Sequence, residues 1–222
     1  MEQSIEQFMQ DFFQRDKKDK VIRYRYLNAY VKKGQIVFAG SSLMEQFPIY
    51  EFMQDFDIPK IIYNRGVGGY TTTEMMETLE ECIFELEPSR LFLNIGTNDF
   101  NTPDYREEEL IERYRMILTK VRERLSEVEI YLMAYYPVNE LAADDPRMQE
   151  VFKQRTNAKL LSANKAVEKL AAEYGAKYID VNTGLYDANG RLKAEYTIEG
   201  MHMYANGYRA VLTELLPYLL EE

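Results

Sequence analysis

The sequence predicts an α/β protein, a three-layer α/β/α sandwich around a five-stranded parallel sheet, with a helical extension at the N-terminus. Two observations predict this fold class. Short apolar runs of strand length recur after residue 34, and amphipathic segments of helix length separate them. Strands that alternate with helices pair in parallel, because each helix crosses back over the sheet. In addition, a length of 222 residues without internal repeats suits one domain with a short extension.

The N-terminal extension, residues 1–33, is predicted to be helical and contains no chemical motif. Its apolar residues recur at the i, i+3, i+4 and i+7 spacing of one helix face: Ile5, Phe8, Met9 and Phe12. The charged stretch Arg15–Lys20 is interpreted as a break, and Val21–Val31 as a second helix that Gly34 ends. We expect this extension to pack on the main domain, residues 34–222, or on a partner.

Five apolar runs are the predicted strands: Ile36–Ala39, Ile61–Tyr63, Leu91–Ile95, Ile130–Ala134 and Tyr178–Val181. Helical periodicity predicts helices in the segments between and after these strands: Thr71–Leu86, Tyr105–Leu125, Val151–Tyr174 and Asn206–Leu220. The longest segment without predicted structure is Tyr136–Pro146, after the fourth strand. The expected sandwich is flavodoxin-like, and such sheets bind ligands beyond the carboxyl ends of their strands.

Composition narrows the classes of function. A formal net charge of −10 disfavours nucleic acid and anionic membrane surfaces as partners. No apolar run approaches the roughly 20 residues of a membrane helix, and the charged N-terminus is unlike a secretion signal. The single cysteine, Cys82, fits a reducing compartment, and the single histidine, His202, excludes a multi-histidine metal site. We therefore predict a cytoplasmic protein without membrane insertion, metal or cofactor.

Polar or glycine-rich motifs follow the first three predicted strands. Residues 40–43 (GSSL) either cap the next helix or present the hydroxyl of Ser42. Residues 66–69 (GVGG) form either an ordinary turn or a loop whose backbone approaches a ligand closely. Residues 96–99 (GTND) form either an Asx turn or a site that aims the amide of Asn98 at developing negative charge.

The histidine near the C-terminus completes a set of chemical groups. Glu199 precedes His202 by three residues and can orient its imidazole, although a lone histidine beside a helix start can be purely structural. Acyl transfer needs a nucleophile, a base, an orienting acid and donors for an oxyanion. The chain offers one of each: Ser42, His202, Glu199, and the donors Gly69 and Asn98. The set predicts an enzyme of acyl transfer.

Taken in their order along the chain, the motifs resemble those of the SGNH/GDSL hydrolases, which are serine esterases and lipases. The family's Gly-Asp-Ser-Leu block is similar to residues 40–43, which implies that Ser42 is the nucleophile. Its second block is similar to residues 64–69 (NRGVGG), and its Gly-x-Asn-Asp block is intact around Asn98. The resemblance implies an oxyanion hole formed by the backbone N–H groups of Ser42 and Gly69 and by the Asn98 side chain.

The last family block, Asp-x-x-His, is similar to residues 199–202 (EGMH), which implies that His202 is the base and Glu199 its acid partner. Two positions depart from the family pattern. Ser41 replaces the aspartate before the nucleophile, and Glu199 replaces the aspartate of the last block. Glutamate keeps the carboxylate but adds a methylene, so the loop must shift. The likeness runs from Val37 to Tyr208, which implies that the main domain is catalytic.

The resemblance implies a serine esterase or acylhydrolase with a small-molecule ester as substrate. Because no lid is evident, we predict a short acyl group such as acetyl, and we expect Tyr70, Tyr135 and Tyr136 to line the substrate pocket. A lysophospholipase or a thioesterase remains an alternative, as does an inactive module that binds a carbohydrate or acyl group. The N-terminal helices offer a contact for a homo-oligomer or another partner.

Overall fold

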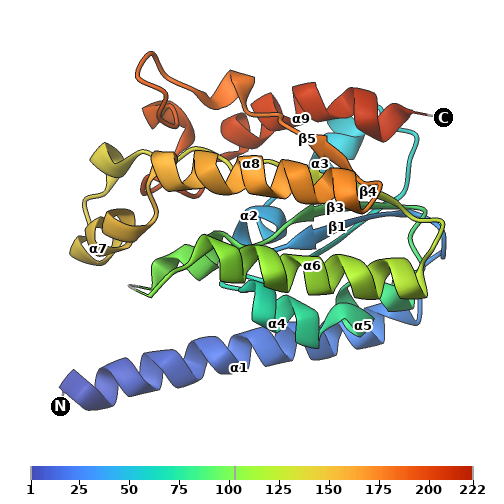
Figure 1. The fold of residues 1–222 in the computed structure, drawn as a ribbon, viewed down its shortest axis with the longest axis horizontal. Helices are drawn as coiled ribbons and strands as arrows, with labels where there is room; N and C mark the ends of the chain where they lie inside the picture. The colour runs from blue at the N-terminus through green and yellow to red at the C-terminus, as the bar shows by residue number, and fades with distance from the viewer. Residues whose placement is uncertain (1, 103, 222) are drawn as a thin grey trace.

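The computed structural model describes residues 2–102 and 104–221, and it has the predicted three-layer arrangement (Figure 1). Within these residues, five strands form one sheet: β1 Ile36–Gly40, β2 Ile62–Gly66, β3 Arg90–Asn94, β4 Glu129–Met133 and β5 Lys177–Ile179. Every neighbouring pair is parallel, and the order across the sheet is β2-β1-β3-β4-β5. The predicted fold class is therefore confirmed.

Alternate strand residues face two different layers of helices. Val37 and Leu91 pack into one apolar core, while Phe38 and Phe92 pack into the other, on the opposite face of the sheet. The first core contacts the helices α1 Glu2–Asn28, α4 Thr72–Glu77, α5 Leu79–Cys82, α6 Glu107–Arg124, α7 Pro146–Gln154 and α8 Asn157–Glu173. The second contacts α2 Ser42–Glu45, α3 Ile49–Asp55 and α9 Ala205–Leu220. Burial on both faces explains why the strands read as nearly continuous apolar runs.

Two predicted helices are divided in the structure. The segment Thr71–Leu86 contains α4, α5 and a 3-10 turn, because the hydroxyl of Thr78 bonds the carbonyl of Glu74 and its backbone leaves the helical region. The segment Val151–Tyr174 is divided before α8, where the side chain of Thr156 accepts the N–H of Lys159. Its first part, α7, begins earlier than predicted, at Pro146.

Helix α1 is continuous, so the predicted break at Arg15–Lys20 is wrong. Lysine and arginine are good helix formers, and Asp16 pairs with Lys20 one turn later at 2.7 Å. At 27 residues, the helix is about 40 Å long. It crosses beneath α4 and α5, and its N-terminal end projects beyond the rest of the fold (Figure 1).

Candidate active site

The three predicted motifs meet at one edge of the sheet. Strands β2, β1 and β3 are neighbours, so the loops after their carboxyl ends lie together. Ser42 begins α2 directly after β1, and Gly69 lies in the loop after β2. Asn98 lies in the 3-10 helix η2, Thr97–Asn101, after β3. The sequence order of the strands therefore brings a hydroxyl, a glycine backbone and an amide to one place.

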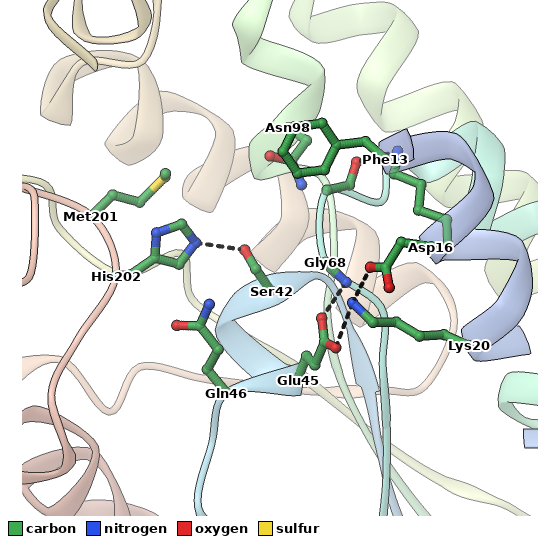
Figure 2. A pocket seen from close by; sticks show the side chains of 12 residues that line it. Phe13, Asp16, Lys20, Ser42, Glu45, Gln46, Gly68, Asn98, Met201 and His202 are labelled. Atoms are coloured by element: carbon green, nitrogen blue, oxygen red, sulfur yellow. Dashed lines mark hydrogen bonds and ion pairs between the residues drawn. The ribbon is translucent and has the colours of Figure 1, made fainter. Parts of the chain in front are cut away.

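His202 reaches the same place from the other end of the chain. Its Nε2 lies 2.9 Å from the Oγ of Ser42, although 160 residues separate the two (Figure 2). On the other side of the ring, Nδ1 hydrogen-bonds Oε1 of Glu199. The structure thus aligns the hydroxyl, the imidazole and the carboxylate in one continuous hydrogen-bonded series.

A tight loop over residues 197–203 holds the imidazole in this position. Thr197 and Met203 form an antiparallel bridge, and the hydroxyl of Thr197 donates to the carbonyl of His202 at 3.0 Å. The same hydroxyl accepts the N–H of Gly200 at 2.8 Å. Gly200 has φ +102°, and a Cβ there would stand 2.4 Å from the carbonyl oxygen of Asn139. Only glycine fits this turn without strain.

Glu199 is held as a carboxylate. Burial alone would raise the pKa of Glu199, but the hydrogen bond and the charge of His202 outweigh it and lower the pKa from its ordinary value. Its second oxygen, Oε2, is buried and has no hydrogen-bond partner within the described part of the chain. At neutral pH this carboxylate is therefore ionised and directed at the imidazole.

Three residues that line one cavity, Ser42, Gly69 and Asn98, carry hydrogen-bond donors. Asn98 lines the same cavity, and one hydrogen of its Nδ2 is used by the carbonyl of Tyr70 at 2.9 Å, which leaves the other hydrogen free to donate. Among the hydrogen bonds of the described residues, the backbone N–H groups of Ser42 and Gly69 have no acceptor. Gly69 adopts φ +74°, the left-handed conformation that glycine favours. These groups can donate to a bound ligand.

A buried arginine, which the sequence analysis did not single out, fixes the amide of Asn98. Arg155 follows α7, and its Nη2 donates to Oδ1 of Asn98 at 2.9 Å and to Oδ1 of Asn101 at 3.0 Å. Its Nη1 contacts the sulfur of Met201, beside His202. Burial lowers the pKa of Arg155 to about 10, although the negative charges of Glu199 and Asp99 act to raise it. Arg155 therefore remains charged at neutral pH. No local pattern marks such a residue, because its partners are 46 to 57 residues away.

The Ser42 hydroxyl opens into a cavity of about 410 Å³ (Figure 2). Its walls are Phe13, Asp16, Lys17, Lys20, Ser42, Glu45, Gln46, Gly68, Gly69, Asn98, Met201 and His202. Four of these residues belong to α1, which the sequence analysis had treated as an extension without chemistry. Charged and amide side chains make up much of the wall, and Phe13 contributes its main aromatic surface.

The three tyrosines predicted to bind substrate do not line this cavity, and that prediction is wrong. Tyr70, Tyr135 and Tyr136 are exposed by only 4%, 2% and 2%. Tyr70 and Tyr135 pack in the core on one face of the sheet, and Tyr136 packs in the other. The hydroxyl of Tyr135 donates to the carbonyl of Ile95 at 2.9 Å. Position just after a strand predicted proximity to the site but not the direction of the side chain.

Metal clusters and membrane-spanning helices are both absent from the described residues. Residues 2–102 and 104–221 contain no group of three or more histidine, cysteine, aspartate or glutamate side chains suited to a metal ion. None of the helices in these ranges is both long and apolar enough to span a bilayer.

The sequence is similar to those of known proteins. A model of the GDSL-like Lipase/Acylhydrolase family matches residues 53–210, well over half of the chain. The platelet-activating factor acetylhydrolase IB subunit alpha2 of Homo sapiens is 24% identical over 196 residues, which cover 86% of this chain and 80% of that protein.

Solved structures share the fold of this chain. A Streptococcus pneumonia protein provisionally described as a platelet activating factor has a TM-score of 0.87 and 31% identity, over 97% of this chain and 98% of that one. A GDSL-like lipase from Bacteroides thetaiotaomicron shares the fold, with a TM-score of 0.73 and 20% identity over 90% and 96% of the two chains. The chain therefore belongs to the GDSL-like Lipase/Acylhydrolase family and is a hydrolase of ester bonds.

Proposed function

We propose that this protein is a serine esterase that removes a short acyl group, acetyl above all, through a triad of Ser42, His202 and Glu199. The observation that carries the proposal is the 2.9 Å contact between Oγ of Ser42 and Nε2 of His202 at the wall of an open cavity. A candidate base must lie within hydrogen-bond reach of the proton that it removes, and this one does.

The proposed reaction proceeds through an acyl-enzyme. Ser42 Oγ attacks the ester carbonyl carbon while His202 Nε2 takes the hydroxyl proton, and the carbonyl oxygen becomes an oxyanion. His202 then gives the proton to the leaving alcohol as the ester C–O bond breaks. A water molecule repeats the two steps on the acyl group, which releases the acid and restores Ser42. Throughout, Glu199 fixes the ring and stabilises the imidazolium.

The oxyanion in this mechanism is held by three donors. These are the backbone N–H groups of Ser42 and Gly69 and the side-chain N–H of Asn98. The first two have no acceptor among the described residues, and Arg155 fixes the direction of the third. Preorganised donors of this kind stabilise the transition state because they need no reorientation when charge develops; losing one typically costs about 100-fold in kcat.

Two considerations favour a short acyl group. The cavity of about 410 Å³ must hold both the acyl and the alcohol part of the ester, and charged side chains form much of its wall. A long alkyl chain would desolvate these charges without replacing their partners. The relatives named as platelet-activating factor acetylhydrolases act, by their name, on an acetyl group. We infer an acetyl or similarly small ester as the substrate class.

The proposal is tested with p-nitrophenyl esters of increasing acyl length. The Ser42→Ala variant should lose turnover by on the order of 10⁵- to 10⁶-fold, whereas Ser162→Ala, on the exposed surface of α8, should match the wild type. The wild-type kcat/KM should fall from acetate to butyrate to octanoate. Unchanged turnover in Ser42→Ala would refute the triad, and a maximum at octanoate would refute the short acyl group.

A further inference from the structure

Helix α1 carries a polar stripe that lies along the glycine loop of the active site. We define the stripe as Lys17, Lys20, Tyr24 and Asn28. These residues are spaced by three, four and four positions, which places them on one face of a helix, one above the other. The family match begins at residue 53, so the stripe lies outside it.

Successive turns of the stripe contact successive residues of the loop. Lys17 Nζ donates to the carbonyl oxygen of Gly69 at 3.0 Å. One turn later, Lys20 Nζ pairs with Oε1 of Glu45 at 2.8 Å, while Oε2 of Glu45 accepts the N–H of Gly68 at 2.6 Å (Figure 2). The helix therefore holds two neighbouring glycines, one directly and one through Glu45.

The stripe continues into the strand that precedes the loop. The hydroxyl of Tyr24 donates to the carbonyl of Gly66 at 2.6 Å. The side-chain oxygen of Asn28 accepts from Nε and Nη2 of Arg65 at 3.0 and 2.8 Å. Four helix positions thus follow the backbone from residue 69 back to residue 65.

These contacts hold the two peptide units that flank the peptide carrying the N–H of Gly69. The N–H of Gly69 belongs to the peptide between Gly68 and Gly69. Glu45 holds the preceding peptide through the Gly68 N–H, and Lys17 holds the following peptide through the Gly69 carbonyl. Two adjacent glycines have wide conformational freedom, so an unrestrained Gly-Gly peptide can rotate. Fixing both neighbours removes that freedom.

Lys17 is well placed for this task. Its side chain is only 15% exposed, and its Nζ also bonds Oε1 of Glu74 at 2.6 Å. The other oxygen of Glu74 accepts the N–H of Thr71, at the start of α4. One ammonium group thereby ties the glycine loop to the helix that follows it.

We propose that α1 is a positioning element of the active site, in which Lys17 and the Lys20–Glu45 pair direct the N–H of Gly69 toward the oxyanion. The inference rests on the proposed function, since it assigns a transition-state role to that N–H. It predicts an effect on kcat rather than on KM, because the oxyanion exists in the transition state and not in the bound ester.

The test compares Lys17→Met with Lys18→Met, its neighbour on the exposed side of the same helix. Lys17→Met should lower kcat for p-nitrophenyl acetate by about tenfold or more, with KM within about twofold, because one of two restraints on an oxyanion donor is lost. Lys18→Met should match the wild type. Lys17→Arg should recover most of the activity, since a guanidinium can bond both the Gly69 carbonyl and Glu74.

A second measurement keeps the two proposals apart. Hydrogen exchange of the peptide covering residues 64–74 should be faster in Lys17→Met than in Lys18→Met, with both variants equally folded by circular dichroism. This readout does not depend on turnover, so it decides whether Lys17 restrains the glycine loop even if Ser42→Ala refutes the esterase. Equal exchange in the two variants, or a kcat of Lys17→Met within about twofold of the wild type, would overturn the inference.

Discussion

The carboxylate beside His202 shows how the fold accommodates a side chain one methylene longer than the aspartate of the related motif. Glu199 uses a single oxygen, Oε1, to accept from both Nδ1 and the backbone N–H of His202, the latter at 3.4 Å. The loop between them turns at Gly200, whose positive φ brings the two residues back together. The extra length is therefore taken up within the loop, and the ring still reaches Ser42.

Replacing this carboxylate should impair the chemical step. Glu199→Gln should lower kcat by on the order of 10³- to 10⁴-fold, because an amide does not stabilise the imidazolium and can donate to Nδ1, which selects the wrong tautomer. Steady-state hydrolysis of p-nitrophenyl acetate measures the loss. Glu195→Gln, on an exposed residue nearby, is the control. A loss below about twofold would move the orienting role to another group.

The same variant should alter the acid sensitivity of folding. The pKa of Glu199 is lowered from its ordinary value in the folded protein, because its bonds to His202 outweigh burial, which would raise it. Its contribution to stability is therefore present above the unfolded pKa and is lost as the pH falls through the folded pKa. Between about pH 6 and pH 3, the wild type should lose more unfolding free energy than Glu199→Gln. Equal losses in urea titrations would contradict this assignment.

Arg155 is predicted to act through Asn98. Arg155→Met removes the donors to the side-chain oxygens of Asn98 and Asn101, and the freed amide can then rotate away from the cavity. We expect kcat to fall by about 10- to 100-fold while KM changes less. Arg155→Lys should not restore activity, because a single ammonium lacks the forked geometry. Arg147→Met, at an exposed ion pair, serves as control. A kcat within about twofold of the wild type would show that Asn98 is held without this arginine.

At the scale of elements, α1 has two exposed aromatic neighbours with different surroundings. Phe12 and Phe13 are 56% and 57% exposed, yet only Phe13 contributes to the wall of the Ser42 cavity. Figure 2 shows Phe13 and Gln46 at opposite ends of the view, both among the residues that line the cavity. The helix thus offers an apolar surface to whatever part of the ester extends beyond the acyl group.

Phe13→Ala should therefore weaken the binding of esters with aromatic alcohols. Loss of roughly 50 Å² of apolar contact corresponds to about 1.3 kcal/mol, so KM for p-nitrophenyl acetate should rise by close to tenfold. Phe12→Ala, equally exposed on the same helix, should leave KM unchanged. Methyl acetate, which has almost no alcohol part, should be affected equally little by both variants. Matching KM values for the two variants on p-nitrophenyl acetate would remove Phe13 from the substrate site.

At the scale of the whole molecule, two apolar cores on opposite faces of the sheet hold the strand ends in register. Cys82 belongs to one of them: it is fully buried in α5, in the core to which α4, α6 and β3 also contribute. Burial raises the pKa of its thiol to about 12 and outweighs the hydrogen bond to Thr78, which acts to lower it. The thiolate is the reactive form of cysteine, so the folded protein suppresses its reaction.

The rate at which Cys82 reacts should therefore report opening of the core. At about pH 8, where a free thiol is partly ionised, a disulfide reagent should label the native protein far more slowly than the protein in denaturant. The labelling rate should rise in parallel with variants that lower the free energy of unfolding. Rapid labelling of the stable native protein would show that α5 opens locally without the rest of the core.

The sequence by itself determined the fold class and located the strands, although their ends differ from the prediction; the second strand, for example, ends at Gly66 rather than at Tyr63. Apolar runs of strand length and helical periodicity are local properties of the sequence, so they can be recognised without knowledge of the tertiary packing. The motifs around Ser42 and Asn98 could also be placed from the sequence, because parallel strands bring their carboxyl ends to one edge of the sheet. His202 does not directly follow a strand of the sheet, and only its motif singled it out. Those three residues were found in the sequence, and the structure places them together.

Only the tertiary structure decided which other side chains face the site. Tyr135 follows a strand end, as Ser42 does, but its hydroxyl turns into the core, and no local pattern distinguishes the two. Arg155 and Lys17 depend on partners more than 50 residues away, which the sequence presents as ordinary charges. Hydrophobic periodicity and motifs are properties of the sequence alone, whereas the direction of a side chain depends on the neighbours that tertiary packing brings to it.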